Sequence, residues 1–216
     1  MGLLDRLAPR KPEPDAGPHP PAVPAVADPV FATKALRKFL ACLTARESPV
    51  LLDLGPVVGS NVSFFGEQLG CKIFVEDVFA DLERHVREGK TDGLPAFLKK
   101  RFTQNSGTVD GVLCWDLIDY LDRPAAQELA GELTRILRPD GALLGFFGTA
   151  RQPDTRYTKF IVVDDVNLKY RFYPAARGRQ TILVNRDIMR LFAGLRVSDS
   201  FLLQNNLREI LFRKPA

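Results

Sequence analysis

The sequence predicts an α/β fold, a doubly wound and mostly parallel sheet that ends in an antiparallel hairpin. A strand expected over 50–54 carries Asp53 and runs into a glycine turn, which is typical of a parallel strand that ends at a ligand-binding edge. Apolar runs and amphipathic helical patterns alternate from there to residue 147. The last two apolar runs are joined only by residues 204–206, and so short a connection suits an antiparallel pair.

Length and composition are those of one soluble domain. The chain has 216 residues, 45% of them hydrophobic. No apolar run approaches the roughly 20 residues of a membrane helix, and residues 1–11 lack the apolar core of a signal peptide, so we expect a cytoplasmic protein. The net charge of +4 does not indicate a nucleic-acid partner. The three cysteines are widely spaced and predict neither a disulfide framework nor a metal site.

A proline-rich tail is expected over 1–29. Proline occurs 8 times between residues 9 and 29, lacks an amide donor and blocks helices, and the stretch offers few apolar groups to bury. We therefore expect a disordered tail followed by one folded domain over 30–216. That domain should open with an amphipathic helix, because apolar residues recur at helical spacing over 31–43.

The elements that follow are expected in regular order. The predicted helices cover residues 60–70, 79–87, 96–102, 124–137 and 186–193, and the predicted strands cover 50–54, 71–75, 110–114, 142–147, 197–203 and 207–213. A regular alternation would require one more strand between 89 and 109, and the sequence shows no good one there.

A hairpin is expected as an insertion over about 150–184. Apolar and polar residues alternate between 166 and 172, which is the period of a strand, and a turn over 175–179 would lead to a partner strand over 181–184. Lys169 and Arg171 make one face of this hairpin basic. Such charges are common on a solvated sheet edge, and they would also suit an anionic acceptor if the hairpin lies over the carboxyl edge of the sheet.

Four short motifs stand at the expected ends of the strands. They are Asp53-Leu-Gly55-x-x-x-Gly59, the acids Glu76 and Asp77, the run over 110–121 that begins Asp-Gly-Val, and the turn Leu137-Arg-Pro-Asp-Gly141. In this order and at these intervals the chain resembles the class I S-adenosylmethionine-dependent methyltransferases over about residues 48–214. The resemblance implies a Rossmann-like sheet, S-adenosyl-L-methionine as cofactor, and methyl transfer to an acceptor that the sequence does not identify.

The resemblance also implies which residues hold the cofactor. Glu76 or Asp77 would accept hydrogen bonds from the ribose hydroxyls, and Asp53 would order the glycine loop or face the cofactor amine. The cofactor-binding candidates are Asp53, Gly55, Gly59, Glu76, Asp77 and Trp115. No metal is implied.

Three polar residues after the strand over 110–114 are the candidates for a catalytic role. Methyl transfer requires mainly alignment of acceptor and cofactor, so few catalytic groups are needed. Asp116, Asp119 and Tyr120 follow the strand where the family places acceptor contacts, and the last two lie at i+3 and i+4 from the first. The alternative is structural, with Trp115 in the core and the acids as helix caps.

The glycine loop departs from the family pattern. The family favours a third glycine at the position of Val57, because a side chain there would stand in the way of the cofactor. Two hypotheses follow, a methyltransferase with an unidentified acceptor and a non-catalytic binding or scaffold protein of the same fold. A nicotinamide-dependent dehydrogenase fits less well, because Gly-x-Gly-x-x-Gly is absent.

Overall fold

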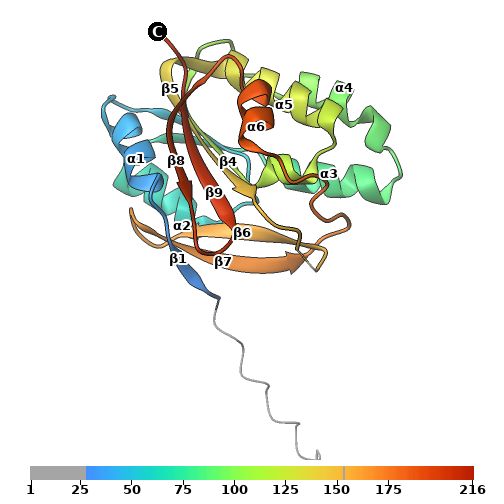
Figure 1. The fold of residues 1–216 in the computed structure, drawn as a ribbon. Coiled ribbons are helices and arrows are strands. Elements are labelled where there is room, and N and C mark those ends of the chain that lie inside the picture. The colour runs from blue at the N-terminus through green and yellow to red at the C-terminus, as the bar shows by residue number, and fades with distance from the viewer. Residues whose placement is uncertain (1–27, 153) are drawn as a thin grey trace, which may run out of the picture.

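The computed structural model describes residues 28–152 and 154–216, which form two sheets with helices packed around the larger one (Figure 1). The proline-rich tail predicted over 1–29 lies, up to residue 27, outside the described residues. Within the described part, no helix combines the length and the apolar character that a bilayer crossing requires.

The main sheet has six strands in the order β3-β2-β4-β5-β9-β8. Its strands are β2 (Val50–Asp53), β3 (Lys72–Val75), β4 (Val109–Trp115), β5 (Leu137–Gly148), β8 (Arg196–Leu202) and β9 (Leu207–Arg213). The first four are mutually parallel, whereas β9 runs antiparallel to β5 and to β8. The predicted fold class is confirmed, including the antiparallel pair at the carboxyl end of the chain. Every residue of β4 is buried, as expected for a central parallel strand.

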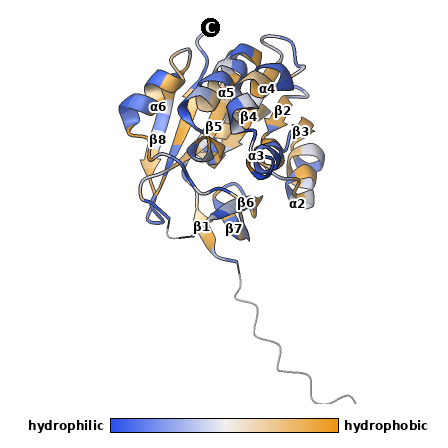
Figure 2. Cartoon of the chain, turned by 90° about the vertical axis from the view of Figure 1, so that its right-hand side faces the viewer, coloured by the Kyte–Doolittle hydropathy of each residue, from blue (hydrophilic) through white to orange (hydrophobic). Residues whose placement is uncertain are grey.

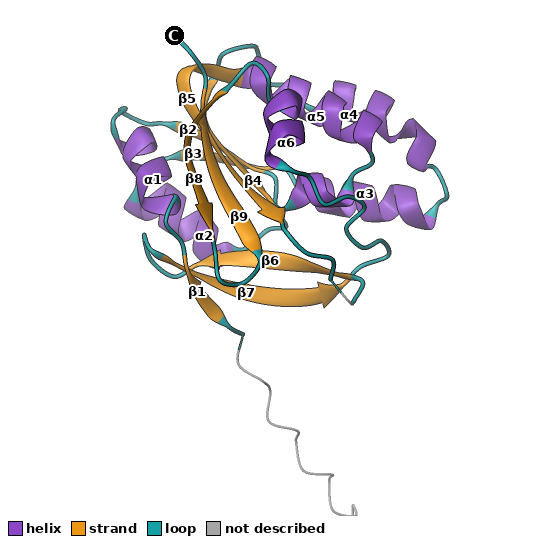
Figure 3. Cartoon of the chain, in the orientation of Figure 1, coloured by secondary structure: helices purple, strands orange, loops and turns teal. Residues whose placement is uncertain are grey.

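Helices cover both faces of this sheet, as Figure 3 shows. They are α1 (Leu36–Thr44), α2 (Gly59–Ser63) with a wider helical turn over Phe64–Gln68, α3 (Val78–Arg87), α4 (Leu94–Arg101), α5 (Arg123–Ile136) and α6 (Asn185–Leu191). On one face α1 packs with the wide turn, and on the other α3, α4 and α5 share one core. Figure 2 colours α3 mostly blue, because its outer face is charged.

The segment between α3 and β4 contains no strand in the described structure. It holds a short helical turn over Thr91–Gly93 and then α4. The sequence shows no strand pattern here, and the structure agrees. As a result β3 is an edge strand of the main sheet, and α4 packs beside α5.

A second, three-stranded antiparallel sheet lies across the carboxyl ends of the parallel strands (Figure 1). Its order is β1-β7-β6, and its strands are β1 (Val30–Ala32), β6 (Arg156–Val162) and β7 (Asn167–Pro174). We call this sheet the lid. Its inward residues Phe160, Leu168 and Tyr170 are buried in the same core as α1.

Two sequence predictions about the lid are wrong in detail. The partner of β7 is β6, not the stretch over 181–184, which forms neither helix nor strand. The backbone just before residue 181 pairs with the turn after β4, because the Gln180 amide donates to the carbonyl of Asp119. The helix expected from residue 31 begins only at Leu36, because Phe31 lies in β1 and packs edge-on against Tyr170 at 4.8 Å.

Candidate functional site

The predicted site residues lie at the carboxyl ends of β2, β3 and β4, beneath the lid. Asp53 ends β2 and is buried. Its Oδ1 accepts hydrogen bonds from the Gly55 amide at 2.9 Å and from Trp115 Nε1 at 2.6 Å. Burial raises the pKa of Asp53 to about 6, against the opposing effect of these two bonds. Asp53 therefore ties the glycine loop to the residue that ends β4.

Trp115 lies directly over the glycine loop. Its backbone has a φ of 49°, a left-handed conformation that side chains seldom adopt, and its indole is 5% exposed. A Cβ at Gly55 would stand 2.9 Å from ring atoms of the indole, so only glycine fits beneath it. The hollow that remains beside Gly55, Trp115 and Thr158 has a volume of about 20 Å³, room for one water molecule.

The lid holds the indole in place from above. The Phe160 ring of β6 stacks on Trp115 with ring centres 5.1 Å apart and planes 4° apart, and Phe146 of β5 lies 5.8 Å away. Asn61 of α2 joins this arrangement to the glycine loop. Its amide donates to the Phe160 carbonyl and accepts from the Val162 amide, both at 2.8 Å. The sequence places Asn61 at the start of the helix predicted over 60–70. Its place one turn before buried Phe65 is the signal that it faces inward.

The two acids at the end of β3 already have protein partners. Glu76 forms an ion pair with Arg101 of α4 at 2.5 Å, and Gln104 donates to it at 3.4 Å. The Asp77 carboxylate accepts from the Ala80 amide at 2.9 Å and so caps α3. Arg101 belongs to α4, in the segment between α3 and β4 where a regular alternation would have placed a further strand.

The three catalytic candidates surround Arg179, a buried arginine at the end of the turn that the sequence predicts over 175–179. Arg179 Nη2 donates to Asp116 at 2.9 Å, and its Nε lies 3.4 Å from Asp119 in an ion pair. Asp119 also accepts from the Gly148 amide at 2.6 Å. The Tyr120 hydroxyl donates to the Arg156 carbonyl of the lid at 2.8 Å. The side chain of Arg179 is only 7% exposed, and an arginine in a glycine-containing turn carries no sequence signal for burial.

Burial also sets the protonation of this cluster. It raises the pKa of Asp119 to about 8, while Arg179 and the Gly148 amide oppose the rise. Burial raises the pKa of Asp116 as well, again against Arg179. One positive charge, that of Arg179, thus faces two carboxyls whose mutual repulsion opposes the ionisation of both at once. Arg179 balances the charge of one ionised carboxyl, so the cluster is close to neutral without a ligand.

The remaining predicted residues lie at the rim. Gly59 begins α2 with open space around it, and Val57 is exposed. Lys169 and Arg171 point to the outer face of the lid, beside the exposed side of the glycine loop, and Arg171 forms an ion pair with Asp28 at 2.7 Å. The lid thus has the apolar inner face and the basic outer face that the alternation predicts.

At Gly55 the residues present do not fit S-adenosylmethionine as they are arranged. Trp115 covers Gly55, Arg101 neutralises Glu76, and Asp77 caps a helix. A small-molecule site needs about 300 Å³ or more, far above the hollow left beside Gly55.

Comparison with known proteins supports the fold. No family model and no curated protein matches the sequence. The structure is similar to that of the PH0226 protein from Pyrococcus horikoshii OT3, with 14% identity, a TM-score of 0.51, and coverage of 83% of this chain and 88% of that one.

Two similar structures are methyltransferases. One is a 1,6-didemethyltoxoflavin-N1-methyltransferase from Burkholderia thailandensis with bound S-adenosylhomocysteine (17% identity, TM-score 0.49, 84% of this chain and 79% of that chain). The other is the CcbJ methyltransferase from Streptomyces caelestis (13%, 0.49, 83% and 95%). Both TM-scores lie below 0.5, so neither likeness bears on the activity of this chain. The strand order of the main sheet, together with the likeness to the PH0226 protein, gives this chain a Rossmann-like fold, as its sequence predicts.

Proposed function

We propose that this chain is a non-catalytic binding member of the methyltransferase fold, in which its own side chains fill the place of the cofactor. One observation carries the proposal. The Trp115 indole lies against Gly55 and donates to buried Asp53, where the resemblance puts S-adenosylmethionine.

Opening this site has a substantial energetic cost. A cofactor at Gly55 would displace Trp115, which loses a hydrogen bond to a carboxyl, worth about 1.5–3 kcal/mol if charged. It also loses two aromatic contacts, each worth about 0.5–1.5 kcal/mol. Displacing Trp115 thus costs about 2.5–6 kcal/mol, which lowers the apparent affinity roughly 10²- to 10⁴-fold, because only the open fraction of the protein can bind.

The second candidate is an active S-adenosylmethionine-dependent methyltransferase, and a specific observation favours it. A hollow of about 480 Å³ adjoins the glycine loop and the end of β3, lined in part by Pro56, Asp77, Phe79 and Tyr157. A ligand there would contact the loop from outside while Trp115 stays in place. The acceptor of such an enzyme would be an anion held by Lys169 and Arg171.

Calorimetric titration with S-adenosylmethionine and S-adenosylhomocysteine separates the two candidates. We expect no saturable heat from the native protein at millimolar ligand, and weak binding by Trp115→Ala, which frees the space above Gly55. Phe146→Ala is the matched control, because it loosens the same aromatic core without uncovering Gly55. Micromolar binding by the native protein, together with transfer of a labelled methyl group to a cell extract, would establish the second candidate instead.

We also propose a cytoplasmic location. All three cysteines are free thiols, and Cys71 and Cys114 are buried where no partner thiol reaches them. Unpaired thiols are typical of a reducing compartment. Fractionation of cells that express the full chain tests this location.

A further inference from the structure

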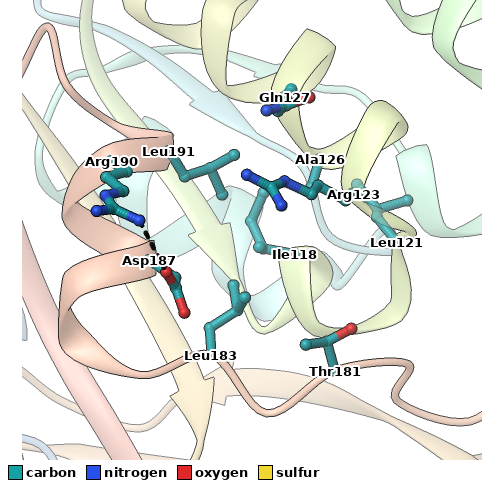
Figure 4. Close-up of a pocket in the computed structure, with 10 residues that line it drawn as sticks. All are labelled: Ile118, Leu121, Arg123, Ala126, Gln127, Thr181, Leu183, Asp187, Arg190 and Leu191. Atoms are coloured by element: carbon teal, nitrogen blue, oxygen red, sulfur yellow. Dashed lines mark ion pairs between the residues drawn. The ribbon is translucent and has the colours of Figure 1, made fainter.

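A cavity of about 330 Å³ lies on the helical side of the molecule, away from the lid core. It is enclosed by the turn after β4, the first turn of α5, the stretch over 181–183, and α6 (Figure 4). Small-molecule sites in proteins begin at about this volume. None of the sequence motifs pointed to it, because its walls come from four separated segments.

The inner walls of this cavity are apolar. Ile118, Leu121 and Ala126 are buried, and Leu183 and Leu191 complete the wall from the opposite side. α6 is anchored in the main core by fully buried Ile188 and Phe192, so it is a firm wall. Such a lining binds an aliphatic or aromatic body through the hydrophobic effect.

The rim of the cavity carries the guanidinium groups of Arg123 and Arg190 and the carboxylate of Asp187, so its net charge is positive. Arg123 forms no ion pair or side-chain hydrogen bond within residues 28–152 and 154–216, and Figure 4 shows its side chain extending from α5 towards α6. Arg190 stands on the other side, 3.8 Å from Asp187, which also lies 3.9 Å from Arg186. These pairs are long and solvent-exposed, so they hold Arg190 only weakly.

We propose that this cavity is a binding site for a small amphipathic carboxylate, with its apolar body against Leu183 and Leu191 and its carboxylate between Arg123 and Arg190. Guanidinium groups bind carboxylates through paired, charge-assisted hydrogen bonds. One anionic head matches the rim, because Arg123 has no ionic partner among the described residues and Arg190 shares Asp187 with Arg186. This site is separate from the covered glycine loop, so the proposal does not depend on the outcome for S-adenosylmethionine.

Calorimetry with three eight-carbon probes tests the head group. Octanoate, octan-1-ol and octylammonium share one body and differ in charge. We expect octanoate to bind at least tenfold more tightly than either of the others. No saturable binding of octanoate up to millimolar concentration, or equal affinity for octylammonium, would overturn the proposal.

Point variants test the position of the site. Arg123→Gln and Arg190→Gln should each weaken octanoate at least tenfold, the ratio expected for one lost charge-assisted bond, and leave octan-1-ol unchanged. Arg186→Gln is the matched control, because it removes an exposed arginine from the same helix and the same acid without lining the cavity. All three side chains are exposed, so the variants should melt like the native protein. An equal loss in Arg186→Gln would show a general charge effect and refute the site.

Discussion

Two regions cover the carboxyl edge of the main sheet beneath the lid. Beside β2 the edge is covered by packed aromatic rings, whereas beside β5 it is covered by buried charged side chains. On the first side Trp115, Phe160 and Asn61 join the glycine loop to the lid. On the second, Arg179 lies between Asp116 and Asp119. Stacked rings act at every pH, but an ion cluster depends on the protonation of its members. The charged closure therefore depends on pH through all of its members, whereas the aromatic closure depends on pH only through Asp53, which accepts a hydrogen bond from Trp115.

The largest effect should come from removing the buried cation. Arg179→Ala leaves two buried carboxyls without their counter-charge, and breaking a buried ion pair in this way costs about 3–5 kcal/mol. Urea unfolding followed by circular dichroism measures the loss. Arg177→Ala is the control, since that half-buried residue forms, among the described residues, a single side-chain hydrogen bond, to Gln180, and its loss should change stability by less than about 1 kcal/mol. A loss below 1 kcal/mol for Arg179→Ala would mean that the cluster does not hold the edge.

An intermediate effect is expected at the aromatic closure, where two glycines of one loop should respond differently. Gly55→Ala forces a methyl group against the indole of Trp115 and should destabilise the fold by about 1–3 kcal/mol. Gly59→Ala meets nothing and lies in a helical turn, so it should be neutral or stabilise by up to about 1 kcal/mol. Thermal melts of the two variants compare them directly. Equal effects would show that the indole does not rest on Gly55 in solution.

The smallest expected effect is a pH dependence of the free energy of unfolding, to which the buried carboxyls of Asp53 and Asp119 each contribute. Burial raises the native pKa of Asp53 to about 6 and that of Asp119 to about 8, from an ordinary value near 4. Between these limits the folded protein binds more protons than the unfolded chain, so stability falls as pH rises. Asp53→Asn should remove the slope between about pH 4 and 6, and Asp119→Asn the slope that extends to about pH 8. Urea titrations at intervals of half a pH unit resolve these two pH ranges. Identical profiles of stability against pH for the two variants would contradict the assignment.

Local patterns predicted most of the main sheet. The strands over 50–54, 110–114 and 207–213 lie where the sequence places them, because a short apolar run bounded by turn residues is a local signal. The partner of β7 was missed because strand pairing is a non-local choice. The stretch over 156–162 carries Arg156 and Lys159, which weaken its apolar pattern.

The candidate site was predictable in its membership but not in its arrangement. Position at strand ends brings Asp53, Gly55 and Trp115 together, as the order of elements implies. The left-handed backbone that aims the indole at Gly55 has no signature in the sequence. The burial of Arg179 depends on how the return segment crosses the sheet edge, which only the three-dimensional path of the chain decides.

The contact between Asn61 and β6 has a consequence for self-association. β6 is an outer strand of the lid, and such strands offer unpaired amides and carbonyls to strands of other molecules. The Asn61 side chain binds the Phe160 carbonyl and the Val162 amide, two of the backbone groups that a neighbouring strand would take. On the opposite border β1 is only 3 residues long. One amide side chain and one very short strand thus protect the lid from intermolecular β-pairing.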